Sequence, residues 1–295
     1  MYDLIIRRGL NKKKVTVCII LLILLVTLAT ISGIRLAEHH EVKKQAKLYE
    51  EQQAQIRKEE EEKQRQEELA KQAEINKRIE QTSRAFTDEE KDRIKHIYRS
   101  TGEKRVFLTF DDGPSETVTP LILDLLKKEN VKATFFTLGT NVNNYPDLVK
   151  REFDEGHYLA SHGYSHVYSQ IYASPQSVLD EYNNCITAMR NPSGMPDNNP
   201  HLFRFPGGYW GGKYASIKTE ALTLLNENNI AHIDWNALTS DAAGAKTTEE
   251  FIAELDKTVP KHNSVVVLMH DAGGKKATAE ALPTIISYFR NQGFE

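Results

Sequence analysis

The chain has 295 residues, of which 27% are charged, and a formal net charge of −3 at pH 7. This length accommodates one substantial domain with appendages. From residue 85 onward, 28 Asp and Glu outnumber 21 Lys and Arg. Such a domain repels phosphate backbones, which argues against nucleic acid as a partner. Of its two cysteines, Cys18 lies in the apolar stretch at residues 15–34 and Cys185 is alone in the remainder of the chain. We therefore expect no disulfide within the domain, and an exported domain must rely on its core.

The first predicted element is a membrane span at residues 15–34, a stretch of 20 residues without a charge. It follows a basic tail, residues 1–14, that contains Arg7, Arg8 and Lys12 to Lys14. Because positive residues stay cytoplasmic, we expect the N-terminus inside and all later residues outside. A cleaved signal peptide is the alternative, with residues 29–31 as a weak cleavage site, but the apolar stretch is long for one.

Residues 35–100 are predicted to form a charged helical stalk or linker. Up to about residue 84 they are rich in Glu, Gln, Lys and Arg and contain neither Gly nor Pro. This composition favours a solvated helix with Glu–Lys pairs. Residues 57–68 contain no apolar side chain, so a sustained coiled-coil seam is missing. A spacer that holds the following domain away from the membrane is therefore preferred to a stable coiled coil.

Strands and helices alternate in the last segment, residues 101–295. Strands are expected at 106–110, 132–138, 157–160, 230–235 and 264–269, with an extended segment at 201–205. Helices are expected near 116–129, 145–155, 175–190, 213–228, 248–259 and 278–291. The repeat implies an α/β domain with a mainly parallel sheet. About 190 residues is short for an eight-fold barrel, so a distorted (β/α) barrel with fewer than eight repeats is predicted, with an open doubly wound sheet as the alternative.

Two adjacent carboxylates, Asp111 and Asp112, end the first of these strands, and Gly113 and Pro114 break it. Carboxylates at the rim of a core cost stability unless they bind a cation or transfer protons. Read alone, the four residues fit a solvated turn equally well, because Asp, Gly and Pro are ordinary turn residues.

Two histidines four residues apart, His162 and His166, follow the strand at 157–160. Alone the pair is a weak signal. Combined with a carboxylate from another strand end, it gives two imidazoles and one carboxylate with open positions, which is typical of a catalytic metal site. These donors suit Zn²⁺, with Co²⁺ or Mn²⁺ as alternatives, and the second carboxylate stays free as a base for the attacking water.

Two further strand ends carry polar groups. Arg204, at the end of the extended segment, could pair with the free carboxylate, and the glycines at 207 and 208 could bring backbone N–H groups close to a substrate. A glycine-rich surface turn is the alternative. His270 ends the last strand as a candidate general acid, with Asp241 and Asp234 as candidates to orient it.

Aromatic side chains could form a sugar-binding wall near these strand ends. The candidates are Tyr209, Trp210 and Trp235. For Trp235, buried packing is an equally good interpretation.

These segments make the chain resemble the polysaccharide deacetylases of carbohydrate esterase family four, the NodB-homology domain. TFDDGP at residues 109–114, His162-x-x-x-His166, Arg204-x-Pro206 and Leu268-x-His270 match its first, second, third and fifth motifs. The resemblance covers residues 104–295. It implies a distorted barrel, a divalent metal that is usually zinc, and hydrolysis of an N-acetyl group on a sugar.

The resemblance also implies residue roles. Asp111 would be the general base, held by Arg204, and His270 would protonate the departing amine with Asp241 as its partner. The metal ligands would be Asp112, His162 and His166. The residues expected at the oxyanion and the substrate are Gly207, Pro206, Tyr209, Trp235 and Leu268.

The chain departs from the family pattern in three places. Gly207 stands where the family often has Tyr, and Asp241 is followed by Ala242 instead of Trp. Family domains also usually continue into one more strand after the last helix, whereas this chain stops at Glu295. Either the chain is truncated or the sheet closes differently.

The predicted function is that of a membrane-anchored, extracellular N-acetylglucosamine deacetylase acting on cell-wall peptidoglycan. A second hypothesis keeps the chemistry and changes the polymer to poly-N-acetylglucosamine, chitin oligomers or acetylated xylan. A third is a non-catalytic, metal-stabilised glycan-binding protein, which would need neither a base nor an acid.

Overall fold

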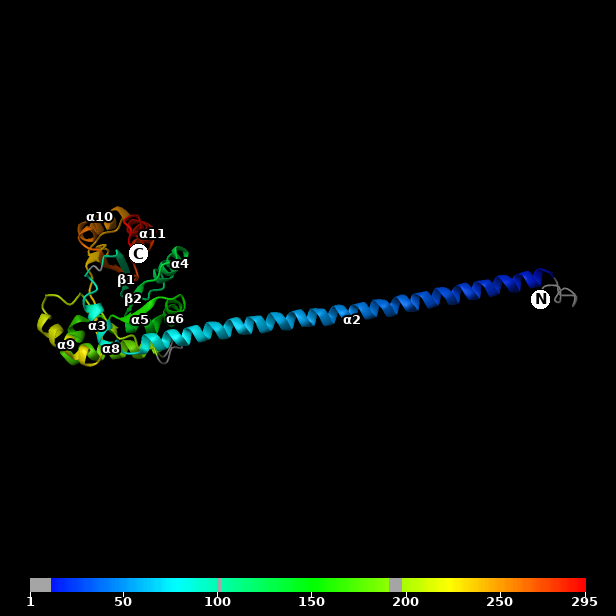
Figure 1. Ribbon diagram of the computed structural model, residues 1–295, viewed down its shortest axis with the longest axis horizontal. Coiled ribbons are helices and arrows are strands. Elements are labelled where there is room, and N and C mark those ends of the chain that lie inside the picture. Colours follow the sequence, from blue (N-terminus) through cyan, green and yellow to red (C-terminus); the bar gives the residue numbers. More distant parts are fainter. Residues whose placement is uncertain (1–11, 100–101, 191–197) are drawn as a thin grey trace. The chain divides into compact units, whose positions relative to one another are not determined.

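The computed structural model describes residues 12–99, 102–190 and 198–295 (Figure 1). The chain divides into two compact units, residues 1–72 and residues 73–295. Helix α2 (Lys12–Ser83) has 72 residues and begins in the first unit. Its N-terminal part is apolar and long enough to cross a membrane, and large side chains such as Leu22 and Leu25 are 64% and 66% exposed. Contact with lipid would cover such a surface.

The second unit is built on a parallel sheet of seven described strands. In chain order they are β1 (Arg105–Asp111), β2 (Thr134–Thr137), β3 (Tyr158–Ser161), β4 (Leu202–Phe203), β5 (Ala231–His232), β6 (Ala237–Leu238) and β7 (Ser264–His270). Their order in the sheet is β5-β4-β3-β2-β1-β7-β6. Strand β1, between β2 and β7, pairs with β7 over its whole length, so that Asp111 lies beside His270.

The sheet is curled into an incomplete barrel, which confirms the predicted distorted barrel. Strands β5 and β6 are at opposite edges, yet only residues 233–236 connect them. Since an extended chain advances at most about 3.6 Å per residue, the two edges must lie close together. An open doubly wound sheet would keep them apart.

Among the described residues that follow α2, ten helical segments accompany the sheet. They are α3 (Asp88–Lys95), α4 (Thr119–Glu129), α5 (Gly139–Asn144), α6 (Pro146–Asp154), α7 (Tyr168–Ile171), α8 (Pro175–Arg190), α9 (Ala215–Glu227), α10 (Thr248–Thr258), the 3₁₀ turn η1 (Val259–Lys261) and α11 (Lys276–Asn291). The six predicted helices are present within three residues at each end. The short α5 and α7 were not predicted, and neither was β6. The strand expected at 230–235 is reduced to β5, because the chain leaves that edge to reach β6.

Apolar side chains fill both faces of the sheet, as alternation along buried strands requires. Phe135 and Leu159 belong to the larger core that the outer helices share. Their neighbours Phe136 and Ala160 belong to a smaller core inside the curl. Residues 94–98, in and after α3, contribute Ile94, Ile97 and Tyr98 to this inner core, so they cover the inside of the barrel.

The second unit begins at Ala73, whereas the sequence predicts a domain boundary at residue 101. Ile75 and Ile79 pack against the larger core. Between them, Arg78 donates to the carbonyl oxygens of Phe153 and His157 and stacks over the Phe153 ring at 4.3 Å. One Ile pair within a highly charged helix is too short a pattern to reveal this docking from sequence.

The last residues cover the part of the β1 edge that β2 leaves free. Phe294 is buried and packs edge-on against Phe289. The backbone N–H of Glu295 donates to Lys104 O (3.0 Å), and its carbonyl accepts from Val106 N–H (2.8 Å). These bonds extend the pairing of β1 beyond the β2 register, which starts at Thr109.

Candidate active site

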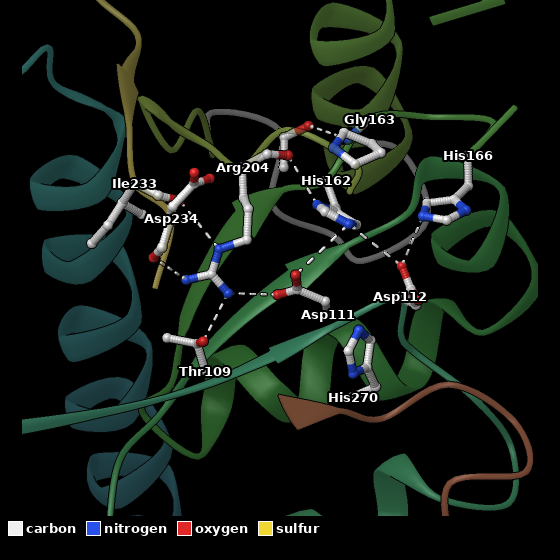
Figure 2. A network of polar contacts seen from close by, with 12 residues as sticks. Thr109, Asp111, Asp112, His162, Gly163, His166, Arg204, Ile233, Asp234 and His270 are labelled. Atoms are coloured by element: carbon white, nitrogen blue, oxygen red, sulfur yellow. Dashed lines mark hydrogen bonds and ion pairs between the residues drawn. The ribbon is translucent and has the colours of Figure 1, made fainter. Parts of the chain in front are cut away.

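The predicted polar residues meet at the carboxyl ends of the strands, where parallel α/β folds place their sites. Figure 2 shows Asp111, Asp112, His162 and Arg204 converging, with His270 beside them. They come from the ends of β1, β3, β4 and β7. Four separate apolar runs therefore deliver their terminal polar side chains to one place.

Asp111 and Asp112 are neighbours in sequence but enter different environments. Asp112 has a positive φ of 72°, which turns its side chain away from that of Asp111 and towards the two histidines (Figure 2). The next residue must be glycine, because a Cβ at Gly113 would lie 2.0 Å from Asp271 Oδ2. The backbone at this strand end thus separates the two carboxylates.

The first environment contains Asp112, His162 and His166. Asp112 Oδ1 lies 3.5 Å from His162 Nε2 and 3.3 Å from His166 Nε2, and one donor atom of each residue lies within 4.8 Å of the others. His162 Nδ1 is 2.9 Å from Arg204 O. Because a carbonyl only accepts, Nδ1 carries the hydrogen and the lone pair is on Nε2.

This donor set fits a divalent cation. Burial lowers the pKa of His162 to about 3, so its imidazole is neutral and the Nε2 lone pair faces Asp112. Asp112 Oδ1 is buried and accepts no hydrogen bond from the described residues. Two imidazole nitrogens and one carboxylate oxygen, with room for further ligands, match the open coordination of catalytic sites.

The loop that carries both histidines is fixed by Glu181 of α8. Its Oε2 accepts hydrogen bonds from the backbone N–H groups of Tyr164 (2.5 Å) and Ser165 (2.7 Å), and its Oε1 accepts from Ser165 Oγ (2.7 Å). Glu181 was not predicted. The available signal was a carboxylate on the apolar face of α8, between Val178 and Cys185, which are both buried.

The second environment is a buried ion pair. Arg204 Nη1 lies 2.7 Å from Asp111 Oδ1, and the two side chains are 0% and 2% exposed. Arg204 also donates to Thr109 Oγ1 and to the backbone carbonyls of Ile233 and Asp234. Burial raises the pKa of Asp111, and Arg204 only partly offsets this effect. The result is a fixed carboxylate of increased basicity.

His270 is paired with Asp241. The Nδ1 atom of His270 lies 2.9 Å from Asp241 Oδ1, while Asp241 Oδ2 accepts from the His270 backbone N–H and from Thr278 Oγ1. Burial lowers the pKa of His270, but the hydrogen bond and charge of Asp241, with the nearby charges of Asp111 and Asp112, outweigh this effect, so the pKa is raised. Asp234, the other candidate, is elsewhere: it bonds His232 Nε2 and the Tyr209 N–H.

The predicted substrate-side residues are divided between two places. Leu268 is half-buried and shares a strand face with His270, and Pro206 O accepts from Tyr172 Oη at 2.6 Å. Trp235 is half-buried, with Arg204 5.7 Å from its ring centroid. By contrast, Tyr209 and the 82% exposed Trp210 line a groove of 540 Å³ beside α3 that does not include the histidine cluster.

Gly207 is exposed and has a positive φ of 72°. Among the hydrogen bonds of the described residues, its backbone N–H donates none. An open N–H at this position is available to a bound oxygen atom.

Comparison with known proteins agrees with this geometry. The sequence model described as polysaccharide deacetylase matches residues 98–230. The peptidoglycan-N-acetylglucosamine deacetylase PgdA of Listeria monocytogenes is 33% identical over 217 residues, which are 69% of this chain and 40% of that protein. A chitooligosaccharide deacetylase of a Bradyrhizobium species is 31% identical over 207 residues, 66% of this chain and 89% of that protein.

A solved CE4 esterase from Streptococcus mutans has the same fold. It superposes with a TM-score of 0.62 at 32% identity, covering 74% of this chain and 92% of the esterase. This chain spans 40% of the Listeria protein but most of the esterase. With the motifs, the curled parallel sheet and these relatives, the chain belongs to the polysaccharide deacetylase family.

Proposed function

We propose that this protein is a metal-dependent deacetylase that hydrolyses the N-acetyl group of N-acetylglucosamine residues in cell-wall peptidoglycan and releases acetate. The observation that carries the proposal is the separation of two neighbouring carboxylates. Asp112 joins two histidines with open coordination, and Asp111 is held by Arg204 within reach of the same space. Amide hydrolysis needs a Lewis acid and a base side by side.

Asp112, His162 and His166 would hold the cation, and Zn²⁺ suits their nitrogen and oxygen donors best, with Co²⁺ or Mn²⁺ as alternatives. When bound, such an ion polarises the amide carbonyl and favours ionisation of water. His162 is oriented for this role by its bond to Arg204 O, and Glu181 holds the loop.

Asp111 is the proposed general base. Its Oδ2 lies 3.7 Å from His162 Nε2, so it borders the cation site and can take a proton from water placed there. Its burial makes the carboxylate more basic, while Arg204 keeps it ionised and fixed. The Arg204 side chain has no exposed surface, so its role is to position Asp111.

The open N–H of Gly207 would donate to the acyl oxygen as negative charge develops there. His270, kept protonated and oriented by Asp241, would give a proton to the leaving nitrogen. The products are then acetate and a free amine on the sugar. Pro206, Leu268 and Trp235 would border the acetyl group, and Tyr209 a more distant sugar.

The proposed location is the outer face of the cell membrane. A basic tail precedes the apolar part of α2, so residues 1–14 would be cytoplasmic and the second unit outside, near the wall polymer. The Listeria relative is named for peptidoglycan, which supports the same substrate here.

Another acetylated polymer is the second candidate, favoured by the name of the Bradyrhizobium relative, chitooligosaccharide deacetylase. Poly-N-acetylglucosamine and acetylated xylan are further members of this class. A purely glycan-binding role is disfavoured because it would need neither the buried Asp111–Arg204 pair nor the His270–Asp241 pair.

The test is acetate release by the purified, Zn²⁺-loaded protein on peptidoglycan, chitin oligomers, poly-N-acetylglucosamine and acetyl-xylan. We expect the highest kcat/KM on peptidoglycan. A higher value on another polymer would replace the substrate, and no release from any of the four would reject the activity.

A further inference from the structure

The backbone of Gly207 and the hydroxyl of Tyr168 occupy adjoining space. A Cβ built on Gly207 would lie 2.6 Å from Tyr168 Oη and 3.1 Å from Tyr168 Cζ. Gly207 also has a positive φ of 72°, a conformation that favours glycine. The Tyr168 phenol therefore occupies the space that a side chain at position 207 would need, and only glycine fits there while the phenol keeps its place.

The Tyr168 ring is held from two sides. It packs edge-on against His166, with ring centroids 5.5 Å apart, and against Tyr172 at 5.9 Å. Tyr172 is itself fixed to the 206–207 loop by its hydrogen bond to Pro206 O. The phenol thus lies between a histidine of the proposed cation site and the loop that carries the Gly207 N–H.

The Tyr168 hydroxyl remains available. Tyr168 is 40% exposed, and no hydrogen bond of its hydroxyl is found among the described residues, whereas the neighbouring Tyr172 is buried and bonded. A rigid ring with an open hydroxyl is a preorganised donor, which loses little conformational entropy when it binds an oxygen atom.

We propose that Tyr168 is a substrate-contacting residue whose hydroxyl donates a hydrogen bond to the acetyl oxygen beside the Gly207 N–H. This inference rests on the proposed deacetylase function and adds a donor to it. Tyr168 keeps its proton throughout, so the hydrogen bond strengthens as negative charge develops on the acetyl oxygen and weakens when acetate leaves. The proton for the leaving amine still comes from His270.

The test compares Tyr168→Phe with the wild-type chain, both loaded with Zn²⁺, on the polymer that the wild type deacetylates best. Loss of one donor to an oxyanion typically lowers kcat about 10²-fold, and we expect this loss in kcat with KM changed less than about threefold. Zn²⁺ content and the melting temperature should stay at wild-type values. Tyr288→Phe, which removes a hydroxyl bonded to Asp256 on the exposed side of α11, is the matched control and should keep full activity.

A kcat of Tyr168→Phe within about twofold of wild type would overturn the proposal, as would an effect on KM alone. Loss of bound Zn²⁺ in this variant would also overturn it, because Tyr168 would then act by supporting His166. A wild-type chain that releases no acetate rejects the proposed function itself, so the two failures are distinguishable.

A second variant checks the shared space. Gly207→Ala places a methyl group against the phenol and should lower kcat in the wild-type background. If Tyr168 and Gly207 act on the same oxygen, Gly207→Ala should lower kcat less in the Tyr168→Phe background than in the wild-type chain. Additive losses would contradict a shared role.

Discussion

Asp111 and Arg204 form a buried ion pair, with Oδ1 and Nη1 2.7 Å apart, at the edge of the proposed three-residue cation site. Arg204 contributes to both halves of the site, because its side chain fixes Asp111 while its backbone carbonyl accepts from His162 Nδ1. The proposed base and a proposed metal ligand are therefore oriented by one residue.

Asp241→Asn should shift the pH dependence of deacetylation. Burial lowers the pKa of His270, but the hydrogen bond and charge of Asp241, together with the charges of Asp111 and Asp112, raise it above the usual histidine value. Wild-type activity should therefore persist until the pH exceeds the usual histidine range. Without the negative charge of Asp241, His270 loses its proton at lower pH, and the alkaline limb of kcat/KM should move to lower pH. An unchanged limb, as expected for the control Asp256→Asn, would remove Asp241 as the partner.

Removal of the cation should abolish acetate release without unfolding the protein. One ligand atom from each of Asp112, His162 and His166 lies within 4.8 Å of the others, and Asp112 Oδ1 is buried with no hydrogen-bond partner among the described residues. These three residues are therefore the proposed ligands of the ion. We expect chelator-treated protein to be inactive with an unchanged circular dichroism spectrum, and Zn²⁺ or Co²⁺ to restore activity. Activity that resists chelation would refute the metal mechanism.

Ile79→Ala should destabilise the second unit although it lies in the predicted linker. Ile79 packs against the larger core, and truncation of a half-buried isoleucine costs roughly 1–2 kcal/mol. Ile56→Ala, at a side chain that is 46% exposed, should change the unfolding free energy by less than about 0.5 kcal/mol. Urea unfolding followed by tryptophan fluorescence reports on this unit, because Trp210 and Trp235 both belong to it. Equal midpoints for the two variants would contradict the boundary at Ala73.

The proposed topology predicts opposite accessibility for the two termini. In intact cells, a tag before Met1 should be protected from added protease and a tag after Glu295 should be cleaved, because the basic residues before the apolar stretch favour retention inside. Cleavage of the first tag with protection of the second would reverse the orientation.

Site residues could be predicted from the sequence most reliably where a long apolar run ends in polar residues. Strands β1 and β7 each have seven residues; β7 is buried except for the half-buried Leu268, and β1 is buried from Leu108 to Asp111. Parallel pairing then places Asp111 beside His270. The fold prediction was confirmed for the same reason: each βα unit is visible locally, and its strand ends must share one edge of the sheet.

Features that depend on contacts between residues far apart in the sequence could not be predicted in this way. Strand β6 has two residues and is defined only by its pairing with β7. In the sequence, Glu181 is only a charged residue on the apolar face of α8, and its hydrogen bonds to the histidine loop appear only in the fold. The role proposed for Tyr168 likewise depends on its contact with Gly207, which the sequence does not show. Tyr209 was predicted on the substrate side; its ring packs against Phe205 and His232, and contact with a more distant sugar stays a prediction.

Asp111 is the proposed general base and Asp112 a proposed metal ligand. The sharpest test of this assignment measures Zn²⁺ content and peptidoglycan deacetylation on the same preparations of wild type, Asp111→Asn and Asp112→Asn. Asp111→Asn should retain stoichiometric Zn²⁺ while kcat falls about 10²–10⁴-fold, the usual contribution of a general base. Asp112→Asn should lose both Zn²⁺ and activity. If Asp111→Asn deacetylates at a near-native rate, or if Asp112→Asn binds Zn²⁺ as tightly as wild type, the assignment of the two carboxylates is wrong.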